Sequence, residues 1–485
     1  MSAGTNHAEC PFPRSEKGRH MITAVRSMMA TGLMAAAVGL VLVSPLEGAP
    51  VKAGLELWLD ANDASTLSTT NVAGADRVTQ WQDKSLNANH AQRAGSPAAA
   101  THPEYVTTTS NLGNGRPAVR YTTGTDQILI TQNNSPFSGT SFASTVFSVV
   151  RINSAVGNYS SVVSQSPINV YKGMSYVIGS TQGGAAFTDV WKPHGRRAAA
   201  AVPTGGTGQI VTWEVPQWAT NPTTARIYYD GAAQTMSTYG TSGSINLTAN
   251  PFRIGNWDQN RPTDDMVFPG DVGEVIVYSR VVNTAERIIT DNYLGSKYDI
   301  SPIAVDRYDG DTTANGDFDL DVFGVGRRDD GPVPGQVTSL KSAGLGIDIA
   351  AGLDDDEFIM AGHREPDNAR LANQWGRVWY VDPHSLSGDE NVTLTFDFLE
   401  AGLGTEGPEG LYDFKLLFSA TDPDALSPLG FTPSVGTNQV SFALGASLEE
   451  GYYTLGFVPE PATFVVWSLM AGLGIGFGWR RTRKR

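Results

Sequence analysis

The segment DRYDGDTTANGDFDLD, residues 306–321, is rich in side-chain oxygens of the kind that hard cations such as calcium prefer as ligands. It does not fit an EF-hand, because Val322 stands where the loop needs a bidentate acid and no helix pattern flanks it. The residues favour an acidic linker between domains and leave a looser calcium loop as the alternative. That loop would use Asp309, Asp311, Asn315, Asp317 and Asp319.

Catalytic signatures are missing from the sequence. No G-x-S-x-G elbow or H-E-x-x-H zinc motif occurs, and the histidines are scattered. Glycoside hydrolysis needs two positioned carboxylates, whereas Glu274 stands alone in its strand-like run and is expected to make structural hydrogen bonds. We therefore expect no catalytic residues and no enzyme. A carbohydrate-active hydrolase or lyase with a dispersed acid pair remains an alternative, since such a pair is invisible in one sequence.

Three tryptophans stand in or beside polar, loop-like stretches: Trp191, Trp218 and Trp257. An exposed aromatic ring on a loop can stack on a sugar, so these are candidate glycan contacts. Packing in the core is the competing role for each of them. Trp58, Trp81 and Trp213 lie in apolar alternating runs and are expected in the core.

Composition limits the class of protein. The 485 residues carry a net charge of −15, and much of the basic charge lies at the two ends. Nucleic acid is therefore an improbable partner, because phosphate binding needs clustered Lys and Arg. The one cysteine, Cys10, precedes the expected mature start, so stability must come from packing or from bound cations rather than from disulfides.

The N-terminal segment, residues 1–53, has the layout of a secretory signal. Basic residues precede an apolar run from Met28 to Val43, and small residues follow it at Ala49 and Ala53. We expect cleavage near these alanines and export of the rest of the chain. An N-terminal membrane anchor is the alternative.

The C-terminal segment, residues 458–485, combines three features. Pro459-Glu460-Pro461 bars helix and central strand, which predicts an open spacer. Residues 462–479 carry no charge and would span about 27 Å as a helix at 1.5 Å per residue, enough to cross a bilayer. A basic cluster beginning with Arg480 and Arg481 should then stay on the cytoplasmic side.

These three parts, in this order, resemble the PEP-CTERM sorting signal of Gram-negative bacteria. The resemblance implies recognition by an exosortase, a membrane transpeptidase that cuts near the Pro-Glu-Pro box. The chain would be held in the inner membrane before processing and then reach the cell surface or the extracellular matrix.

Between the two ends, the pattern predicts an all-β protein. Short alternating runs separated by Gly, Asn and Asp fill residues 54–300, among them STVFSVVRI, QIVTWEV and GEVIVYSR. One helix is expected from Asn283, which pairs with Glu286 in a capping box and places Ala285, Ile289 and Tyr293 on one face. Residues 301–457 add further alternating strands, such as VTLTFDF, and predict a second, smaller β-sandwich of unknown function.

The stretches LELWLDANDASTL, VTQWQDKSLNANHA and GDVGEVIVYSRVVNTAERIITDNYLGSKY resemble bacterial LamG-type, concanavalin A-like jelly-roll domains. The resemblance covers residues 54–300. It implies a jelly-roll sandwich that binds carbohydrate or protein, in some members with calcium. We therefore expect an exported, non-catalytic protein that binds extracellular polysaccharide or acts as a scaffold through this domain. A purely structural matrix protein is the remaining alternative.

Overall fold

The computed structural model describes residues 50–459 with short gaps. The gaps are residues 94–100, 108–111, 114, 124–126, 134, 136, 139–141, 155–159, 166–173, 183–184, 193–194, 200–205, 217–223, 240–249, 258–265, 366–367, 370, 372 and 405–411. The backbone alone is described at 179–182, 185–192, 195–199, 237–239, 412 and 458–459. The predicted all-β class is confirmed, since this part of the chain holds strands β1–β30 and the single α-helix α1.

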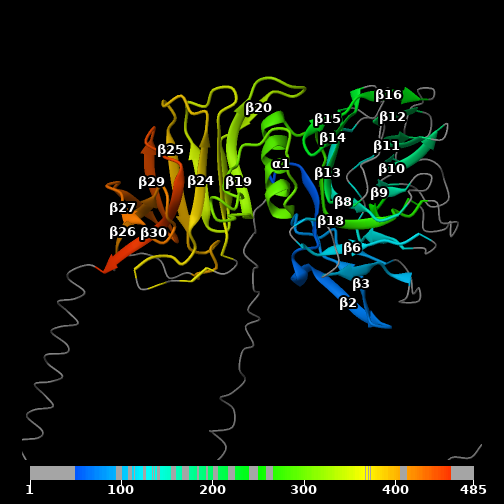
Figure 1. Ribbon diagram of the computed structural model, residues 1–485, viewed down its shortest axis with the longest axis horizontal. Coiled ribbons are helices and arrows are strands. Elements are labelled where there is room, and N and C mark those ends of the chain that lie inside the picture. Colours follow the sequence, from blue (N-terminus) through cyan, green and yellow to red (C-terminus); the bar gives the residue numbers. More distant parts are fainter. Residues whose placement is uncertain are drawn as a thin grey trace, which may run out of the picture. The chain divides into compact units, whose positions relative to one another are not determined.

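The strands before α1 form one 18-stranded antiparallel sheet, which we call the first β region (Figure 1). A short 3-10 helix, Ala64–Thr66, follows its first strand. The strands are β1 (Leu55–Asp60), β2 (Leu67–Val72), β3 (Ala75–Trp81), β4 (Ala91–Gln92), β5 (Glu104–Val106), β6 (Ala118–Arg120), β7 (Leu129–Thr131), β8 (Ser144–Ile152), β9 (Ser161–Gln165), β10 (Met174–Gln182), β11 (Ala185–Lys192), β12 (Gly195–Ala199), β13 (Gln209–Val215), β14 (Arg226–Tyr229), β15 (Ala232–Ala233), β16 (Met236–Tyr239), β17 (Arg253–Ile254) and β18 (Gly270–Tyr278).

Two runs of paired strands enclose the core of this region. One run is β14-β13-β8-β18-β1, and the other is β7-β17-β9-β10-β11-β12-β16. Val150 and Trp213 from the first run belong to the same apolar cluster as Leu129, Val163 and Tyr176 from the second. The two runs are therefore the two layers of a sandwich, as the alternating sequence pattern requires when each strand has one apolar face.

Strand β18 is buried along its whole length, including Asp271 and Glu274, so both of its faces are covered. Val275 and Val277 face the core between the layers. Ile276 and Tyr278 point the other way and join a separate cluster with Trp58, Tyr293 and Leu294. The second face of β18 is thus covered by α1, which supplies the last two of these residues.

Helix α1 runs from Thr284 to Tyr298 and begins with the capping box that the sequence predicts. The Asn283 side chain accepts from the backbone N–H of Glu286, and the Glu286 carboxylate accepts from the backbone N–H of Asn283. All 15 residues of the helix are buried. Half of the side chains on α1 are polar, so its burial requires partners for each of them.

The apolar side chains of α1 belong to two different cores. Ala285, Ile288 and Ile289 pack in the core of the strands that follow the helix, whereas Tyr293 and Leu294 pack against the first β region. Ala285, Ile289 and Tyr293, which the sequence places on one face, therefore belong to two different cores. The helix is shared between two cores, which a single amphipathic stripe does not describe.

The strands after α1 form the second β region, and the predicted β-sandwich is confirmed there. A seven-stranded and a five-stranded sheet, both antiparallel, enclose one apolar core that includes Phe323, Trp379, Leu394 and Phe442. The strands are β19 (Leu320–Arg328), β20 (Gly335–Val337), β21 (Ser339–Ser342), β22 (Leu345–Ile349), β23 (Phe358–His363), β24 (Trp379–His384), β25 (Val392–Asp397), β26 (Tyr412–Ser419), β27 (Ser427–Pro428), β28 (Pro433–Gly436), β29 (Gln439–Gly445) and β30 (Gly451–Pro459).

The signal-like N-terminal segment and the C-terminal segment with the Pro-Glu-Pro box lie mostly outside the described residues. The signal-like residues before Pro50, and Glu460 through Arg485 with the expected membrane helix 462–479, lie outside the described residues. Within the described ranges, no helix has both the length and the apolar character needed to cross a bilayer. Pro459, predicted to open a spacer, is instead the last residue of β30, opposite Tyr412.

Candidate functional site

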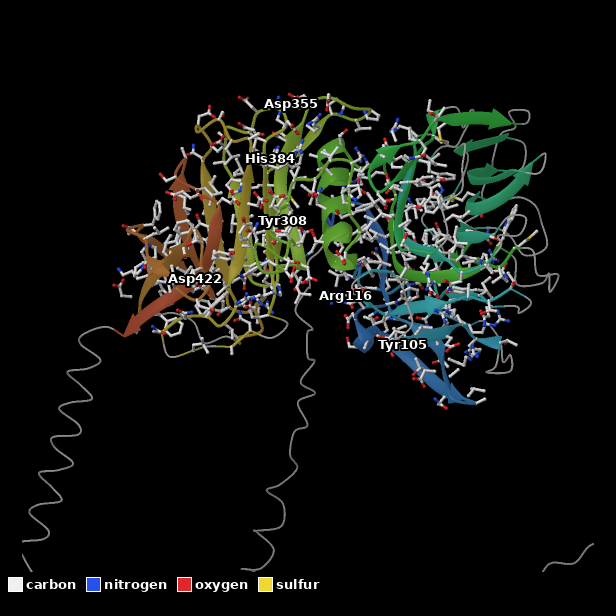
Figure 2. The ribbon with its side chains drawn as sticks, viewed as in Figure 1. Tyr105, Arg116, Tyr308, Asp355, His384 and Asp422 are labelled. Carbon is white, nitrogen blue, oxygen red and sulfur yellow. The ribbon has the colours of Figure 1, made fainter. Side chains whose placement is uncertain are left out.

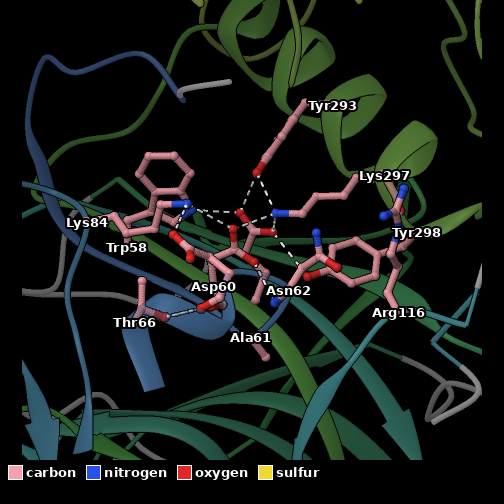
Figure 3. A network of polar contacts seen from close by, with 12 residues as sticks. Trp58, Asp60, Ala61, Asn62, Thr66, Lys84, Arg116, Tyr293, Lys297 and Tyr298 are labelled. Atoms are coloured by element: carbon pink, nitrogen blue, oxygen red, sulfur yellow. Dashed lines mark hydrogen bonds and ion pairs between the residues drawn. The ribbon is translucent and has the colours of Figure 1, made fainter. Parts of the chain in front are cut away.

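Two acidic side chains meet under helix α1. Asp60 is the last residue of β1 and Glu274 lies in the middle of β18, and the antiparallel register places them directly opposite each other. Directly opposed residues of neighbouring strands point to the same face of a sheet. Both side chains are buried, with 1% of Asp60 and 0% of Glu274 exposed. We call Asp60 and Glu274 the buried carboxylate pair, and Figure 3 shows the network of polar contacts around Asp60.

The Glu274 carboxylate accepts hydrogen bonds from two sides. One oxygen accepts from the Trp58 indole N–H at 2.7 Å and from the Tyr293 hydroxyl at 2.9 Å. The other accepts from the Lys297 ammonium at 2.8 Å and from the Tyr298 hydroxyl at 3.2 Å. Three of these four donors come from α1, so the carboxylate fastens the last turns of the helix to the sheet.

The Asp60 carboxylate is held by two lysines. Lys297 lies 2.8 Å and Lys84 lies 3.1 Å from the same oxygen, Oδ2. The other oxygen accepts the backbone N–H of Asn62 at 2.9 Å. Lys84 also pairs with Asp63 at 3.2 Å and lies over the Trp58 ring, 4.5 Å from its centroid. The two central carboxylates thus have two ammonium groups as counter-ions.

Burial and charge act in opposite directions on this pair. Burial alone would raise the pKa of Asp60, but the Lys297 and Lys84 ammonium groups hold it below its ordinary value. Burial raises the pKa of Glu274 above its ordinary value, partly offset by Lys297. The pKa of Lys297 is raised because the attraction of Asp60 and Glu274 outweighs its own burial. The ion-paired form of Asp60 and Lys297 is therefore the stable one.

This arrangement supports structure more directly than catalysis. An acid–base pair has to reach the proton it transfers, at a hydrogen-bond distance or through one water. Here both carboxylates are closed over by Trp58, Tyr293, Tyr298 and the two lysines. The hydrogen bonding expected of Glu274 is present in its four hydrogen bonds, and the acid opposite it, Asp60, belongs to another strand, β1.

The three candidate glycan contacts have separate outcomes. Trp257 is only 2% exposed, so its prediction as a surface contact was wrong. Its polar neighbours in sequence, Asn256 and Arg253, are themselves buried, which explains why the stretch resembled a loop surface. Trp191 lies in β11 with its side chain outside the described residues, and Trp218 lies outside them altogether. Trp58, Trp81 and Trp213 are core residues, as expected.

The acidic segment 306–321 is a packed element rather than an open linker. Tyr308 is 1% exposed and Phe318 is 0% exposed, and both rings contact Tyr380 on β24. Tyr308, labelled in Figure 2, donates its hydroxyl hydrogen to the Phe318 carbonyl at 2.7 Å. Tyr308 and Phe318 thus attach the segment to the seven-stranded sheet. The high density of acidic residues in the sequence gives no sign of this packing.

The five candidate calcium ligands do not converge in this segment. The Asp319 carboxylate pairs with Arg116 at 2.7 Å, and the Asn315 amide donates to the Asp309 carbonyl at 2.9 Å. Burial raises the pKa of Asp311 to about 6, and its carboxylate also interacts with Ser296 on α1. Throughout the described ranges, no three His, Cys, Asp or Glu side chains are placed to hold one metal ion.

Sequence reasoning missed Asp60, Lys84 and Lys297. Trp58 and Glu274 are separated by 216 residues, so the site exists only through the pairing of β1 with β18. A signal was present in the helix, because Lys297 follows Tyr293 by four residues and so shares its face.

Comparison with characterised proteins adds little to this description. No protein-family model matches the chain, and no curated protein matches it. Among solved structures, domain 4 of AbnA, an extracellular arabinanase from Geobacillus stearothermophilus bound to arabinotriose, is 15% identical with a TM-score of 0.31. The match covers 48% of this chain and 96% of that one.

Two further solved structures are similar at the same level. A sialidase from Trypanosoma rangeli in complex with sialic acid is 14% identical, with a TM-score of 0.24 and coverage of 48% of this chain and 32% of that one. A putative carbohydrate-binding protein from Bacteroides ovatus is 15% identical, with a TM-score of 0.24 and coverage of 34% and 55%. The chain thus spans about a third of the sialidase, and similarity this low assigns it to no family.

Proposed function

We propose that this chain is an exported, non-catalytic protein of the bacterial surface or extracellular matrix. Its first β region, a concanavalin A-like jelly roll of LamG type, binds glycan. Its second β region holds the first in a fixed position. The resemblance of residues 54–300 and of the C-terminal segment in sequence supports this proposal, and so does the sandwich architecture of both β regions.

The observation that carries the scaffold part of the proposal is the complete burial of α1. The helix contributes side chains to two cores and is fastened to the first by Lys297 and to a neighbouring strand by Arg287, which lies 4.0 Å from Glu214. A connector buried on all sides resists bending between the two β regions. Such a joint suits a protein that presents a binding face at a fixed distance from its attachment point.

The buried carboxylate pair favours binding over glycoside hydrolysis. Asp60 and Glu274 are the pair of acids that an enzyme hypothesis would first choose, and their lone pairs are occupied by indole, hydroxyl and ammonium donors. A hydrolase or lyase would need a different acid pair. Loss of reducing-end release on replacing a carboxylate would be required to support that alternative.

A glycan screen with the full chain tests the binding function. Because Ala285, Ile288 and Ile289 pack in the second core, truncation after α1 would expose apolar surface, so the intact chain is required. We expect retention of at least one polysaccharide class, with calcium and with chelator tested in parallel. Trp191→Ala and Trp218→Ala variants then test the two remaining tryptophan candidates. Retention of no glycan by a folded protein would leave the purely structural role.

We also propose that residues 462–479 anchor the chain in the inner membrane until an exosortase-type enzyme cuts near Pro459-Glu460-Pro461. The order of the box, the apolar run and the basic end supports this. The intact mass of surface-released protein should lack residues 462–485. A released protein that retains this tail would make the segment a plain anchor.

A further inference from the structure

Five neighbouring strands of the first β region carry a row of alternating charges. Arg77 on β3 is opposite Glu104 on β5, and Glu104 is opposite Arg120 on β6. Arg120 is opposite Asp271 on β18, and Asp271 is opposite Arg151 on β8. Directly opposed residues share one face of a sheet, so these side chains form a continuous row, which we call the arginine ladder.

The ladder lies on the outer face of its layer. The next residues along these strands, Val78, Val119, Val150 and Val272, all belong to the core between the two layers. Because side chains alternate along a strand, the charged residues point away from that core. They occupy the same side of β18 and β8 as the cluster that α1 covers, which includes Val149 and Ala118.

The inner part of the ladder is fully engaged. Arg120 binds the Asp271 carboxylate through two hydrogen bonds of 2.6 and 2.9 Å, and Asp271 is 0% exposed. The pKa of Arg120 is raised chiefly by this hydrogen bonding. This pair is a bidentate ion pair of the strong kind and fixes the centre of the ladder.

The two end arginines make only long ion pairs, and their Nε atoms are buried without a described acceptor. Arg151 approaches Asp271 only to 3.7 Å, and its Nε has no acceptor among the residues that the structure describes. Arg77 reaches Glu104 at 3.7 Å and donates one longer bond, of 3.3 Å, to the His102 carbonyl, while its Nε also lacks a described acceptor. About a fifth of each of these side chains is exposed, 21% and 20%.

We propose that the arginine ladder is the surface through which the first β region binds an acidic polysaccharide, with Arg77 and Arg151 each receiving a carboxylate of the sugar chain. This rests on the glycan-binding function proposed above and names its ligand class. Three arginines face two carboxylates along the row, so the row carries one excess positive charge in a chain whose net charge is −15.

The alternation of positive and negative side chains along the arginine ladder favours a uronic acid polymer over other polyanions as the ligand. A DNA backbone has no hydroxyl group between its phosphates and would meet Glu104, whose side chain is 34% exposed, as a repulsive neighbour. A polyuronate offers hydroxyl groups between its carboxylates, and Glu104 can accept a hydrogen bond from such a hydroxyl. Guanidinium groups bind carboxylates with favourable planar geometry.

The spacing of the arginines is compatible with an extended chain. Neighbouring strands lie about 4.8 Å apart, so arginines on alternate strands are about 10 Å apart and the two end arginines about 19 Å apart. A sugar chain that crosses the strands would therefore meet a guanidinium at each second strand. The ligand is expected to run perpendicular to β18.

The test uses the full chain with polygalacturonate and, as a matched neutral probe, fully methyl-esterified polygalacturonate. Binding is measured at about 0.1 M and about 1 M salt, between which the Debye length falls from about 10 Å to about 3 Å. Arg77→Gln and Arg151→Gln remove donors without breaking a short ion pair. Arg364→Gln, in the second β region and 37% exposed, is the control for loss of one charge.

We expect binding of polygalacturonate but not of its methyl ester, with weakening at high salt. Each ladder variant should weaken binding by roughly tenfold, the usual cost of losing one hydrogen bond to a charged group, whereas Arg364→Gln should not. Unchanged melting temperatures of the variants would show that the loss reflects the surface rather than the fold.

Three outcomes would overturn the inference. Equal binding of the ester, or unchanged affinity in the Arg77→Gln/Arg151→Gln double variant, would show that the ligand does not bind through the arginine ladder. Equal, arginine-dependent binding of DNA or polyglutamate would assign the surface to anions in general. If only neutral glycans are retained in the screen, the ladder inference fails and the proposed function stands, and if no glycan is retained, both fail.

Discussion

Two groups of acidic residues in this protein behave in opposite ways. The segment 306–321 is conspicuous in sequence, yet its acids are held apart by separate partners, such as Arg116 for Asp319 and Ser296 for Asp311. Asp60 and Glu274 are inconspicuous in sequence, yet they meet at full burial under α1 and share the Lys297 ammonium. Counter-ions and burial, rather than the density of acids along the chain, decide which carboxylates act together.

The pKa values of the two groups express the same contrast. In the pair under α1, lysines lower the pKa of Asp60 despite its burial. Beside the acidic segment, burial and, to a smaller extent, the neighbouring charges of Asp309, Glu450 and Asp306 together raise the pKa of Asp382 to about 7. Asp60 is therefore stable as an ion, whereas Asp382 is stabilised by holding a proton.

The largest effect is expected from Lys297→Met. This change leaves two buried carboxylates with one remaining counter-ion, Lys84, and breaking a buried ion pair on one side costs about 3–5 kcal/mol of unfolding free energy. Chemical denaturation of the full chain would measure it. Lys415→Met, whose lysine is 35% exposed and pairs with the 52% exposed Asp413, is the control and should cost well under about 1 kcal/mol. Equal losses in the two variants would contradict a special role for the pair.

The second prediction concerns the contribution of Asp382 to the pH dependence of stability. The folded pKa of Asp382, about 7, lies above its ordinary value of 3.8, so the folded state holds this proton where the unfolded chain has lost it. The resulting stability is fully present below pH 3.8 and is lost as the pH rises through about 7. We expect the unfolding free energy to fall by about 1–2 kcal/mol between about pH 5 and pH 8 from this group.

Asp382→Asn sharpens that test. The amide oxygen can still accept the Asp309 backbone N–H, which the carboxylate accepts at 2.6 Å, but it cannot titrate. The variant should therefore flatten the decline of stability with rising pH. Asp60 has a lowered pKa and contributes no slope in this window, so an unchanged pH profile in Asp382→Asn would show that the proton is held elsewhere.

A smaller effect is expected at the start of α1, away from the carboxylate pair. Asn283→Ala removes the side chain that accepts from the Glu286 N–H at 2.9 Å. Loss of such a cap typically costs about 1 kcal/mol. Asn283→Asp retains the acceptor and should recover most of the stability in thermal melts. A cost as large as that of Lys297→Met would place the main attachment of the helix at its first turn.

The smallest effect is expected from Asp319→Asn in the acidic segment. Its partner Arg116 also donates to the Lys297 carbonyl at 2.9 Å and would keep that bond. Partly exposed pairs contribute about 0.2–1 kcal/mol, so the melting temperature should fall only slightly. A loss of several kcal/mol would mean that the segment, and not the buried pair, holds the two β regions to α1.

Local features of the fold could be predicted from the sequence. The alternation in VTLTFDF places Val392, Leu394 and Phe396 in the core of the second β region, as predicted, because one strand has one buried face. The capping box at Asn283 needs only residues three positions apart, and it is present. Such predictions succeed where the determining partners are close in sequence.

The site could not be predicted because its partners are distant in sequence. Arg287, Asp291 and Lys297 have the polar character of a solvent-facing stripe, yet all are buried. They lie against the first β region, where Lys297 contacts Asp60 and Glu274 and Arg287 contacts Glu214. The arginine ladder likewise exists only in the register of five strands. Trp257 was misplaced for the converse reason, because its polar neighbours are buried with it.

Hydrogen exchange of the full chain, followed separately in the two β regions, tests the central claim that α1 joins them into one rigid body. The account predicts that the slowest amides of β18 and of β23 exchange with the same free energy of opening, and that Lys297→Met lowers both values together. If Lys297→Met lowers the value for β18 and leaves β23 unchanged, the two β regions open independently and the joint at α1 is not rigid.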